Sequence, residues 1–419
     1  MDYRFFIAVC MLSIFAFEAF AQFDEDPIGR DMENNVITTA VPFLMIAPDT
    51  RAGAMGDAGV ATSPDPNSQH WNPAKYVFAE DDMGVALSYT PWLRNIIDDM
   101  NLAYLSGYYR LDAENMLSAS LRYFDMGEIP FRDNNNQPLK IHQPNEFALD
   151  LGYSRLLGSN FSGAVALRYI RSDLTGGMEV GGVPTNPGQS VAGDVAFFYT
   201  NDDMGVSGMN GLLNWGVSIS NIGAKMSYSD NEIRDFIPTN FRTGVYYQLE
   251  IDEYNKIGVA VDMNKLLVPT PPKYETFTDG DTLPDGSISN TTQTIPVAGN
   301  ENPEGISVAG ALFQSWYDAP GPANNYNSVF AEEFAEISWS FGAEYWYSER
   351  FALRAGYFLE HQYKGARKYV TLGAGMKLNV FGLDFAYLIP TGDFNASPLA
   401  NTLRFTLTFD LGAQAVEEG

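Results

Sequence analysis

The stretch from Asn401 to Asp410, NTLRFTLTFD, decides the fold. Its alternate residues Leu403, Phe405, Leu407 and Phe409 are apolar, and the residues between them are charged or carry hydroxyls. Successive side chains of a β-strand point to opposite faces, so this pattern predicts a strand with one apolar and one polar face. The same alternation recurs in residues 147–153, 241–247, 351–357 and 381–388. We therefore expect an all-β protein.

Two features favour a transmembrane barrel over a soluble sandwich, which also alternates. The apolar face carries aromatic residues near strand ends, as the girdles of an outer-membrane barrel do. The other face mixes small residues with isolated charges, which suits a polar lumen: Arg122, Asp150, Arg168, Arg242, Asp262, Arg354, Asp384 and Arg404. No run of about 18 apolar residues follows residue 22, so we expect no transmembrane helix.

Counting the alternating segments gives about fourteen strands, an even number as bacterial single-chain barrels require. The predicted strands are 83–90, 100–110, 115–124, 145–155, 161–170, 190–200, 211–220, 239–248, 255–264, 335–347, 351–360, 367–377, 380–388 and 401–411. Connections after odd-numbered strands are mostly long, and those after even-numbered strands are mostly short; 361–366 and 201–210 fit this alternation least well. Because long loops are extracellular and short turns periplasmic in such barrels, both chain ends of the barrel should be periplasmic.

Composition excludes several classes of protein. The chain has 419 residues, a formal net charge of −27, 1 Cys and 3 His. So acidic a chain is repelled by phosphate backbones, which argues against a nucleic-acid partner. One cysteine and three histidines leave no basis for a disulfide scaffold or a Cys/His metal site, and we expect neither a metal nor a cofactor.

The sequence divides into four predicted regions. Arg4, the apolar run 5–17 and the small-residue pattern Ala19-Phe20-Ala21 are typical of a signal peptide, 1–21. An N-terminal tail and hatch should follow over 22–80, then the barrel over 81–411 with its long loop 265–334, then a C-terminal tail over 412–419. Residues 22–80 do not alternate; they are rich in small residues and turn formers, which need hydrogen-bond partners when buried. A polar lumen offers such partners, so we expect this segment to fold inside the barrel.

The specific motifs of this segment lie between Val41 and Ala74. They read Ala47-Pro48-Asp49-Thr50-Arg51-Ala52-Gly53, then Gly56-Asp57-Ala58-Gly59, then Gln69-His70-Trp71-Asn72-Pro73-Ala74. This run resembles the N-terminal signature of the PorV (LptO) family, outer-membrane components of the type IX secretion system in Bacteroidetes. The sister family PorQ shares parts of the pattern. The resemblance implies a FadL-like barrel with a hatch, to which Asp49, Arg51, Gly53, Gly56, Asp57, His70, Trp71 and Asn72 would belong.

The resemblance also implies a function and partners. PorV-like proteins bind the SprA/Sov translocon barrel, collect cargo proteins by their C-terminal domains and pass them to the surface attachment complex, surrounded by outer-membrane lipid. One alternative is a FadL-like channel for hydrophobic small molecules. The other is a lipid A deacylase, for which Ser68, His70 and Asp65 are the candidate residues. The chain has no Gly-x-Ser-x-Gly elbow, so we expect no catalytic residues and no enzyme.

Aromatic and aliphatic residues in the outer loops are the predicted partner contacts. The first loop holds Trp92, Leu93, Ile96 and Ile97 at helical spacing, and the long loop holds Phe313, Trp316, Tyr317 and Tyr326. The alternative is that the long loop folds over the barrel mouth and buries its own aromatics. Asp279-Gly280-Asp281 and Asp285 resemble part of a calcium loop but lack its full spacing, so we expect a polar turn there.

Overall fold

The computed structural model describes residues 35–94, 99–132, 136–180, 183–229, 234–284, 286–300, 302–391, 399–400 and 402–412. The predicted signal peptide, the tail before residue 35 and the end of the chain after residue 412 lie outside these residues. In the described ranges, no helix is both long and apolar enough to cross a membrane.

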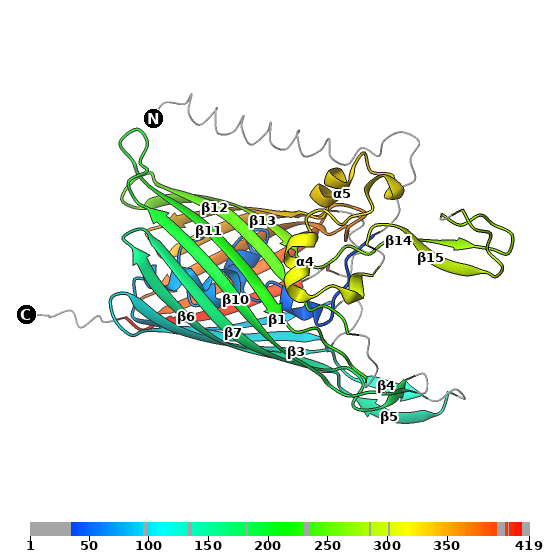
Figure 1. Cartoon of the computed structure of the whole chain (residues 1–419). Helices are drawn as coiled ribbons and strands as arrows, with labels where there is room; N and C mark the ends of the chain where they lie inside the picture. Colours follow the sequence, from blue (N-terminus) through cyan, green and yellow to red (C-terminus); the bar gives the residue numbers. More distant parts are fainter. Residues whose placement is uncertain are drawn as a thin grey trace, which may run out of the picture.

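Fourteen antiparallel strands of the described chain close into one barrel, because β20 pairs with β1 (Figure 1). In barrel order they are β1 Met83–Pro91, β2 Asn101–Arg110, β3 Asn115–Asp125, β6 Asn145–Gly158, β7 Phe161–Asp173, β10 Gly188–Asn201, β11 Asn210–Gly223, β12 Asn240–Glu250, β13 Asn255–Leu266, β16 Ser338–Tyr347, β17 Phe351–Leu359, β18 Lys368–Leu378, β19 Phe381–Pro390 and β20 Thr402–Asp410. The all-β barrel predicted from the sequence is confirmed, and each predicted strand coincides with a barrel strand to within three residues at either end.

The alternation separates the two faces of the wall as expected. On β20, Arg404 and Thr406 point inward and are 3% and 1% exposed, whereas Phe405 and Phe409 point outward and are 40% and 41% exposed. Seven of the eight charges predicted to line the lumen are buried in the same way. They pair with one another and with polar neighbours; for example, Arg168 pairs with Asp150 at 2.5 Å and Asp194 at 3.0 Å.

The connections divide the barrel into two unlike ends. The short-turn end holds 111–114, 159–160, 202–209, 251–254, 348–350 and 379–380. Two of these turns are closed by an aspartate: Asp112 Oδ1 accepts from Glu114 N, and Asp252 Oδ1 accepts from Tyr254 N. The long-connection end holds 92–100, 126–144, 174–187, 224–239, 267–337, 360–367 and 391–401.

Small elements fold within the long connections (Figure 1). The hairpins are β4 Ile129–Arg132 with β5 Pro138–His142, β8 Glu179–Val180 with β9 Val183–Pro184, and β14 Lys273–Phe277 with β15 Gln293–Ala298. The β14–β15 hairpin extends away from the barrel (Figure 1). The same connection, 267–337, then forms η4 Pro303–Gly305, α4 Val308–Gln314, η5 Gly321–Asn324 and α5 Val329–Ala335.

Residues 35–79, which we call the hatch segment, run through the barrel from the long-connection end to the short-turn end. Asn35 N donates to Tyr363 O in the connection 360–367, whereas Ala79 O accepts from Arg110 at the end of β2. Between these points the segment forms η2 Pro42–Met45, α2 Thr50–Gly53, α3 Ser68–Trp71 and η3 Pro73–Phe78, drawn in blue inside the barrel in Figure 1. These elements contact strands on opposite sides of the wall: η3 lies against β6, β7 and β10, and α2 against β18, β19 and β20.

Candidate functional site

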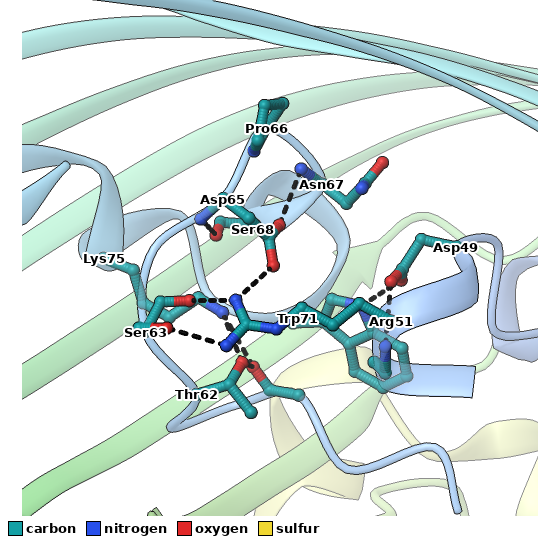
Figure 2. A network of polar contacts seen from close by, with 12 residues as sticks. Asp49, Arg51, Thr62, Ser63, Asp65, Pro66, Asn67, Ser68, Trp71 and Lys75 are labelled. Atoms are coloured by element: carbon teal, nitrogen blue, oxygen red, sulfur yellow. Dashed lines mark hydrogen bonds and ion pairs between the residues drawn. The ribbon is translucent and has the colours of Figure 1, made fainter. Parts of the chain in front are cut away.

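The hatch segment is organised around Asp49 and Trp71, two of the residues that the sequence assigns to the hatch (Figure 2). Asp49 caps α2, because its Oδ2 accepts from Ala52 N at 3.0 Å. Its other oxygen accepts from Trp71 Nε1 at 2.6 Å, which ties α2 to α3. The Trp71 ring is also covered by Arg242 of β12, whose guanidinium lies 4.5 Å from the ring centroid. Asp49 and Trp71 are 1% and 2% exposed, so they form the interior of the hatch.

Arg51 links the hatch segment to the wall. Its guanidinium donates to Ser63 and Asp65 within the segment (Figure 2) and to Glu344 Oε1 of β16 at 2.7 Å. Glu344 also accepts from Arg354 and from Tyr246 OH at 2.8 Å. A carboxylate shared by two arginines and a phenol is fully paired, which is the condition for burying it.

The glycine-rich turn predicted to belong to the hatch contacts the wall at β17, β18 and β20. Asp57 pairs with Arg404 at 2.7 Å and accepts from Tyr369 OH at 2.6 Å. Gly56 has φ +67, and a Cβ there would lie 2.6 Å from backbone atoms of Tyr357. A Cβ on Gly53 would lie 2.1 Å from the Arg404 side chain. These contacts explain why the segment carries glycine at both positions.

The wall likewise carries glycine on its inner face where the hatch segment touches it. A Cβ on Gly216, Gly356 or Gly373 would lie 2.2, 2.0 or 2.4 Å from hatch atoms. Polar wall residues hold the same backbone; Asp262 Oδ2, for example, accepts from Gly59 N and Val60 N at 2.7 and 2.9 Å. Hatch residues at this level have no solvent exposure: Ala54, Met55, Ala58, Val60, Ala61 and Ala74. The lumen is therefore filled at its middle.

His70 and Asn72 anchor the second half of the segment. Arg122 Nη2 lies 2.7 Å from His70 Nδ1, and since arginine only donates, Nδ1 is the acceptor. Asn72 Nδ2 donates to Val60 O and to Phe197 O of β10, and its Oδ1 accepts from Ala74 N. Both predicted hatch residues therefore make structural contacts.

Burial shifts the pKa of three side chains in the hatch segment. It raises the pKa of Asp49 to about 6, with Asp65 adding to the effect. It lowers the pKa of His70 well below its usual range, and the nearby Arg122 charge acts in the same direction. It lowers the pKa of Lys75 to about 8; this side chain donates to Gly59 O and Thr62 Oγ1 (Figure 2).

The geometry of Ser68 does not resemble that of an activated nucleophile. Ser68 is 0% exposed, and its Oγ accepts from Asp65 N at 3.1 Å. Among the described contacts of His70, only the ring nitrogen Nδ1 forms a hydrogen bond, and its partner is Arg122. At the calcium-like motif, Asp281 Oδ2 accepts from Thr278 N and Oγ1, as in a polar turn, and Asp285 lies outside the described residues. Among the residues that the structure describes, no three His, Cys, Asp or Glu side chains gather as a metal site.

At the long-connection end, the predicted contacts of the first loop are half-buried. Trp92 and Leu93 pack on an apolar cluster that includes Val41, Phe43 and Phe124. They also line a cavity of about 600 Å³ between the hatch segment and the rim. Residues 92–94 are not helical, and Ile96 and Ile97 lie outside the described residues.

The four aromatics predicted as contacts in the connection 267–337 divide into two groups. Tyr326 is only 6% exposed and packs beside His361 and Lys364, so it stabilises the connection from within. Phe313, Trp316 and Tyr317 are 73%, 40% and 64% exposed. Their binding to a partner stays a prediction, but the connection does not bury them.

Sequence reasoning missed a buried ion cluster beneath these aromatics. Lys265 Nζ lies 2.8 Å from Glu333 and 2.7 Å from Glu336, and Lys364 Nζ lies 2.6 Å from Glu332 and 3.0 Å from Glu336. These pairs fasten α5 and the following Glu336 to the end of β13 and to the connection 360–367. A signal was present in the sequence, because Lys265 falls on the outward face of β13, where a charge needs a partner.

The family of the chain follows from a match over the hatch segment and the first strands. Residues 29–273 match the family model of the type IX secretion system protein PorV. The chain belongs to the PorV family. A closed β-barrel of this family is an outer-membrane protein, so the outward-facing apolar side chains of the wall face lipid.

Solved structures of two bacterial toluene transporters and of a FadL homologue match the chain at low sequence identity. The toluene transporter TbuX of Ralstonia pickettii is 8% identical, with a TM-score of 0.40 over 86% of this chain and 96% of that chain. A FadL homologue of Pseudomonas aeruginosa is 9% identical, with a TM-score of 0.42 over 90% and 100%. The toluene transporter TodX of Pseudomonas putida is 11% identical, with a TM-score of 0.42 over 90% and 98%. No curated protein matches the chain.

Proposed function

We propose that the chain is a type IX secretion component that binds the SprA/Sov translocon barrel at the long-connection end. It collects cargo proteins there by their C-terminal domains and passes them to the attachment complex at the cell surface. In this proposal the long connections are extracellular, and both chain ends of the barrel are periplasmic. The contrast between long and short connections supports this orientation, because outer-membrane barrels carry short periplasmic turns and long extracellular loops.

The observation that carries the proposal is a filled lumen beneath an elaborated rim. Hatch residues such as Met55 and Val60 have no solvent exposure at the middle of the barrel. The rim, in contrast, carries three two-stranded hairpins and the helices α4 and α5. Such a molecule is suited to hold other proteins on its surface. The match to the type IX secretion family supports partners from that secretion system.

The experiment shortens the hairpin that extends farthest from the barrel in Figure 1. Lys273 and Ala298 are paired at its base, so residues 274–297 can be replaced by an Asn-Gly turn without moving the base. We expect this variant to retain its barrel, measured by circular dichroism, and to recover less translocon and cargo when the tagged protein is purified from outer membranes. The matched control replaces residues 202–209 at the short-turn end by the same turn.

Two results would contradict the proposal at different levels. If the unmodified protein recovers neither translocon nor cargo, the function is wrong. If the hairpin variant and the control recover both equally well, β14–β15 is not the docking element.

A channel for hydrophobic small molecules is the second candidate, and the cavity of about 600 Å³ favours it. Phe43, Trp92 and Phe124 line this cavity at the long-connection end, with Glu146 and Arg367 among its polar lining residues. The filled middle of the lumen argues against passage. Uptake of labelled oleate into vesicles containing the protein, compared with protein-free vesicles, decides between the two, and we expect no difference.

We also propose that the chain is not an enzyme. Ser68 is buried, and Nδ1 of His70 is turned to Arg122, so the two do not form the nucleophile and base of a hydrolase. A strain carrying Ser68→Ala should therefore show unchanged lipid A acylation by mass spectrometry. Retained acyl chains in that strain alone would make Ser68 a deacylase residue.

A further inference from the structure

The connection 267–337 folds back over the outer wall of the barrel. Along the outward face of β13, Val259 and Val261 are 47% and 41% exposed, but Lys265, which points the same way, is 1% exposed. The residues that cover Lys265 belong to the connection: Glu333 and Glu336 pair with its ammonium group, and Trp316 lies 5.7 Å from it. The connection is therefore attached to the lipid side of the wall.

Aromatic contacts on both sides of Lys265 support this placement. Trp316 packs edge-on against Phe241 of β12, with ring centroids 5.6 Å apart. Phe334 of α5 packs against Trp339 of β16, with centroids 6.4 Å apart. Phe241 of β12 pairs with Lys265 of β13, and Trp339 of β16 pairs with Met263, two residues before Lys265 on β13. The connection thus lies across the three adjacent strands β12, β13 and β16, and α4 is seen over the strand ends in Figure 1.

The height of this contact lies within the apolar band of the barrel. The outward face of β13 is exposed and apolar from Ile257, which is eight residues before Lys265. At about 3.3 Å per residue this is about 26 Å along the strand, or about 20 Å along the membrane normal at a tilt of about 40°. Outer-membrane barrels have an apolar band about 25 Å tall. Lys265 and its cover therefore start below the upper edge of that band.

The outer surface of the cover is aromatic. Phe313 of α4 and Phe330 of α5 are 73% and 77% exposed, and Tyr317 is 64% exposed. The charges of this region, Lys265, Glu332 and Glu333, are buried beneath them. An exposed aromatic surface over charges that are paired with one another is suited to an apolar environment rather than to water.

We propose that Phe313, Tyr317 and Phe330 lie in the outer leaflet and that, with Trp316 and Phe334, they anchor the connection 267–337 to lipid. Lipid is the neighbour because the patch is continuous with the lipid-facing wall: Trp316 and Phe334 of the same connection pack on Phe241 and Trp339, which point outward from β12 and β16. In this proposal Phe313, Trp316 and Tyr317 contact lipid, in place of the protein partner that the sequence predicts for them. It is independent of the translocon and cargo proposed above.

Site-directed spin labelling of the full chain in phosphatidylcholine vesicles tests this proposal. The sequence has one cysteine, Cys10, within the predicted signal peptide, so a label on a new cysteine is unique after cleavage. The variants are Phe313→Cys, Tyr317→Cys and Phe330→Cys. Leu167→Cys, at an outward wall position that is 68% exposed, is the lipid control, and Thr276→Cys on the exposed β14 strand is the water control. The readout is the ratio of collision rates with oxygen and with a water-soluble nickel chelate.

We expect the three labels to give ratios within about twofold of the Leu167→Cys label and several-fold above the Thr276→Cys label. Ratios like that of the water control would overturn the proposal. Labels shielded from both reagents would also overturn it, because they would show a protein contact. A second measurement needs no cysteine: brominated lipid should quench the part of the tryptophan fluorescence that is lost in Trp316→Phe, and absence of such quenching would contradict the proposal.

Discussion

Replacing Glu344 by Gln should loosen the hatch segment from the wall. Glu344 of β16 is buried and is the shared acceptor of Arg51, Arg354 and Tyr246. The amide of Gln has nearly the same shape but no charge, so Arg51 loses its partner in the wall and keeps only Asp65 and Ser63 of its own segment. Arg354 keeps Asp384, so the change acts mainly on the link between hatch and wall.

The magnitude follows from the burial of this link. Removing one partner of a buried ion pair costs about 3–5 kcal/mol. The Glu344 side chain is 0% exposed and that of Arg51 is 11% exposed, so solvent screening reduces this value little. At about 1.4 kcal/mol for each factor of ten, the population of the loosened hatch should rise by about a hundredfold to several thousandfold.

Hydrogen exchange measured by mass spectrometry is the assay, because exchange reports the free energy of local opening. The informative amides are Gly59 N and Val60 N, which donate to Asp262 of the wall. Glu250→Gln is the matched control: Glu250 pairs with Lys256 at the short-turn end, and its side chain is 36% exposed. Such exposed pairs contribute about 0–1 kcal/mol. Unchanged protection of Gly59 and Val60 in Glu344→Gln, or an equal loss in the control, would refute the reasoning.

Two further predictions concern the hatch. Gly356→Ala places a Cβ 2.0 Å from Gly56 N, so hatch amides should exchange faster while the barrel keeps its circular dichroism. Gly193→Ala, whose Cβ would lie 3.5 Å from Ala166 O, should leave exchange unchanged. Asp49 has a pKa of about 6 in the folded protein against 3.8 in an unfolded chain, so the folded state holds the extra proton between these values. Hatch stability should therefore fall as pH rises from about 4 to 6 and level off above, and Asp49→Asn should remove this contribution; an identical pH profile in the variant would contradict it.

The strands were predictable because their signal is local. Each outward Leu, Val or Phe stands two residues from the next, and each inward Arg or Asp occupies the other face, so neighbours in the chain suffice to identify a strand such as β20. The alternation of long and short connections was likewise predictable, because it depends only on the spacing between successive strands in the sequence.

The partners of the inward charges were not predictable, because they depend on register between strands and on the path of the hatch. Arg168 finds Asp150 and Asp194 on neighbouring strands, but Arg122 and Arg404 find His70 and Asp57 in the hatch segment. No spacing in the sequence distinguishes these two outcomes. For the same reason, the sequence indicated that Gly53 and Gly56 belong to the hatch but not which wall atoms require them.

By itself the sequence determined that the chain forms a barrel of about fourteen strands, with a polar inner face and a non-alternating segment before it, because strand alternation is a property of adjacent residues. The tertiary structure alone decided which side of the barrel the connection 267–337 covers. That placement depends on Lys265 meeting Glu333 and Glu336, residues 68 and 71 positions away. Burying such a charge is favourable only when it is paired with opposite charges. Pairing of β16 with β13 brings Glu333 and Glu336, which lie just before β16, next to Lys265.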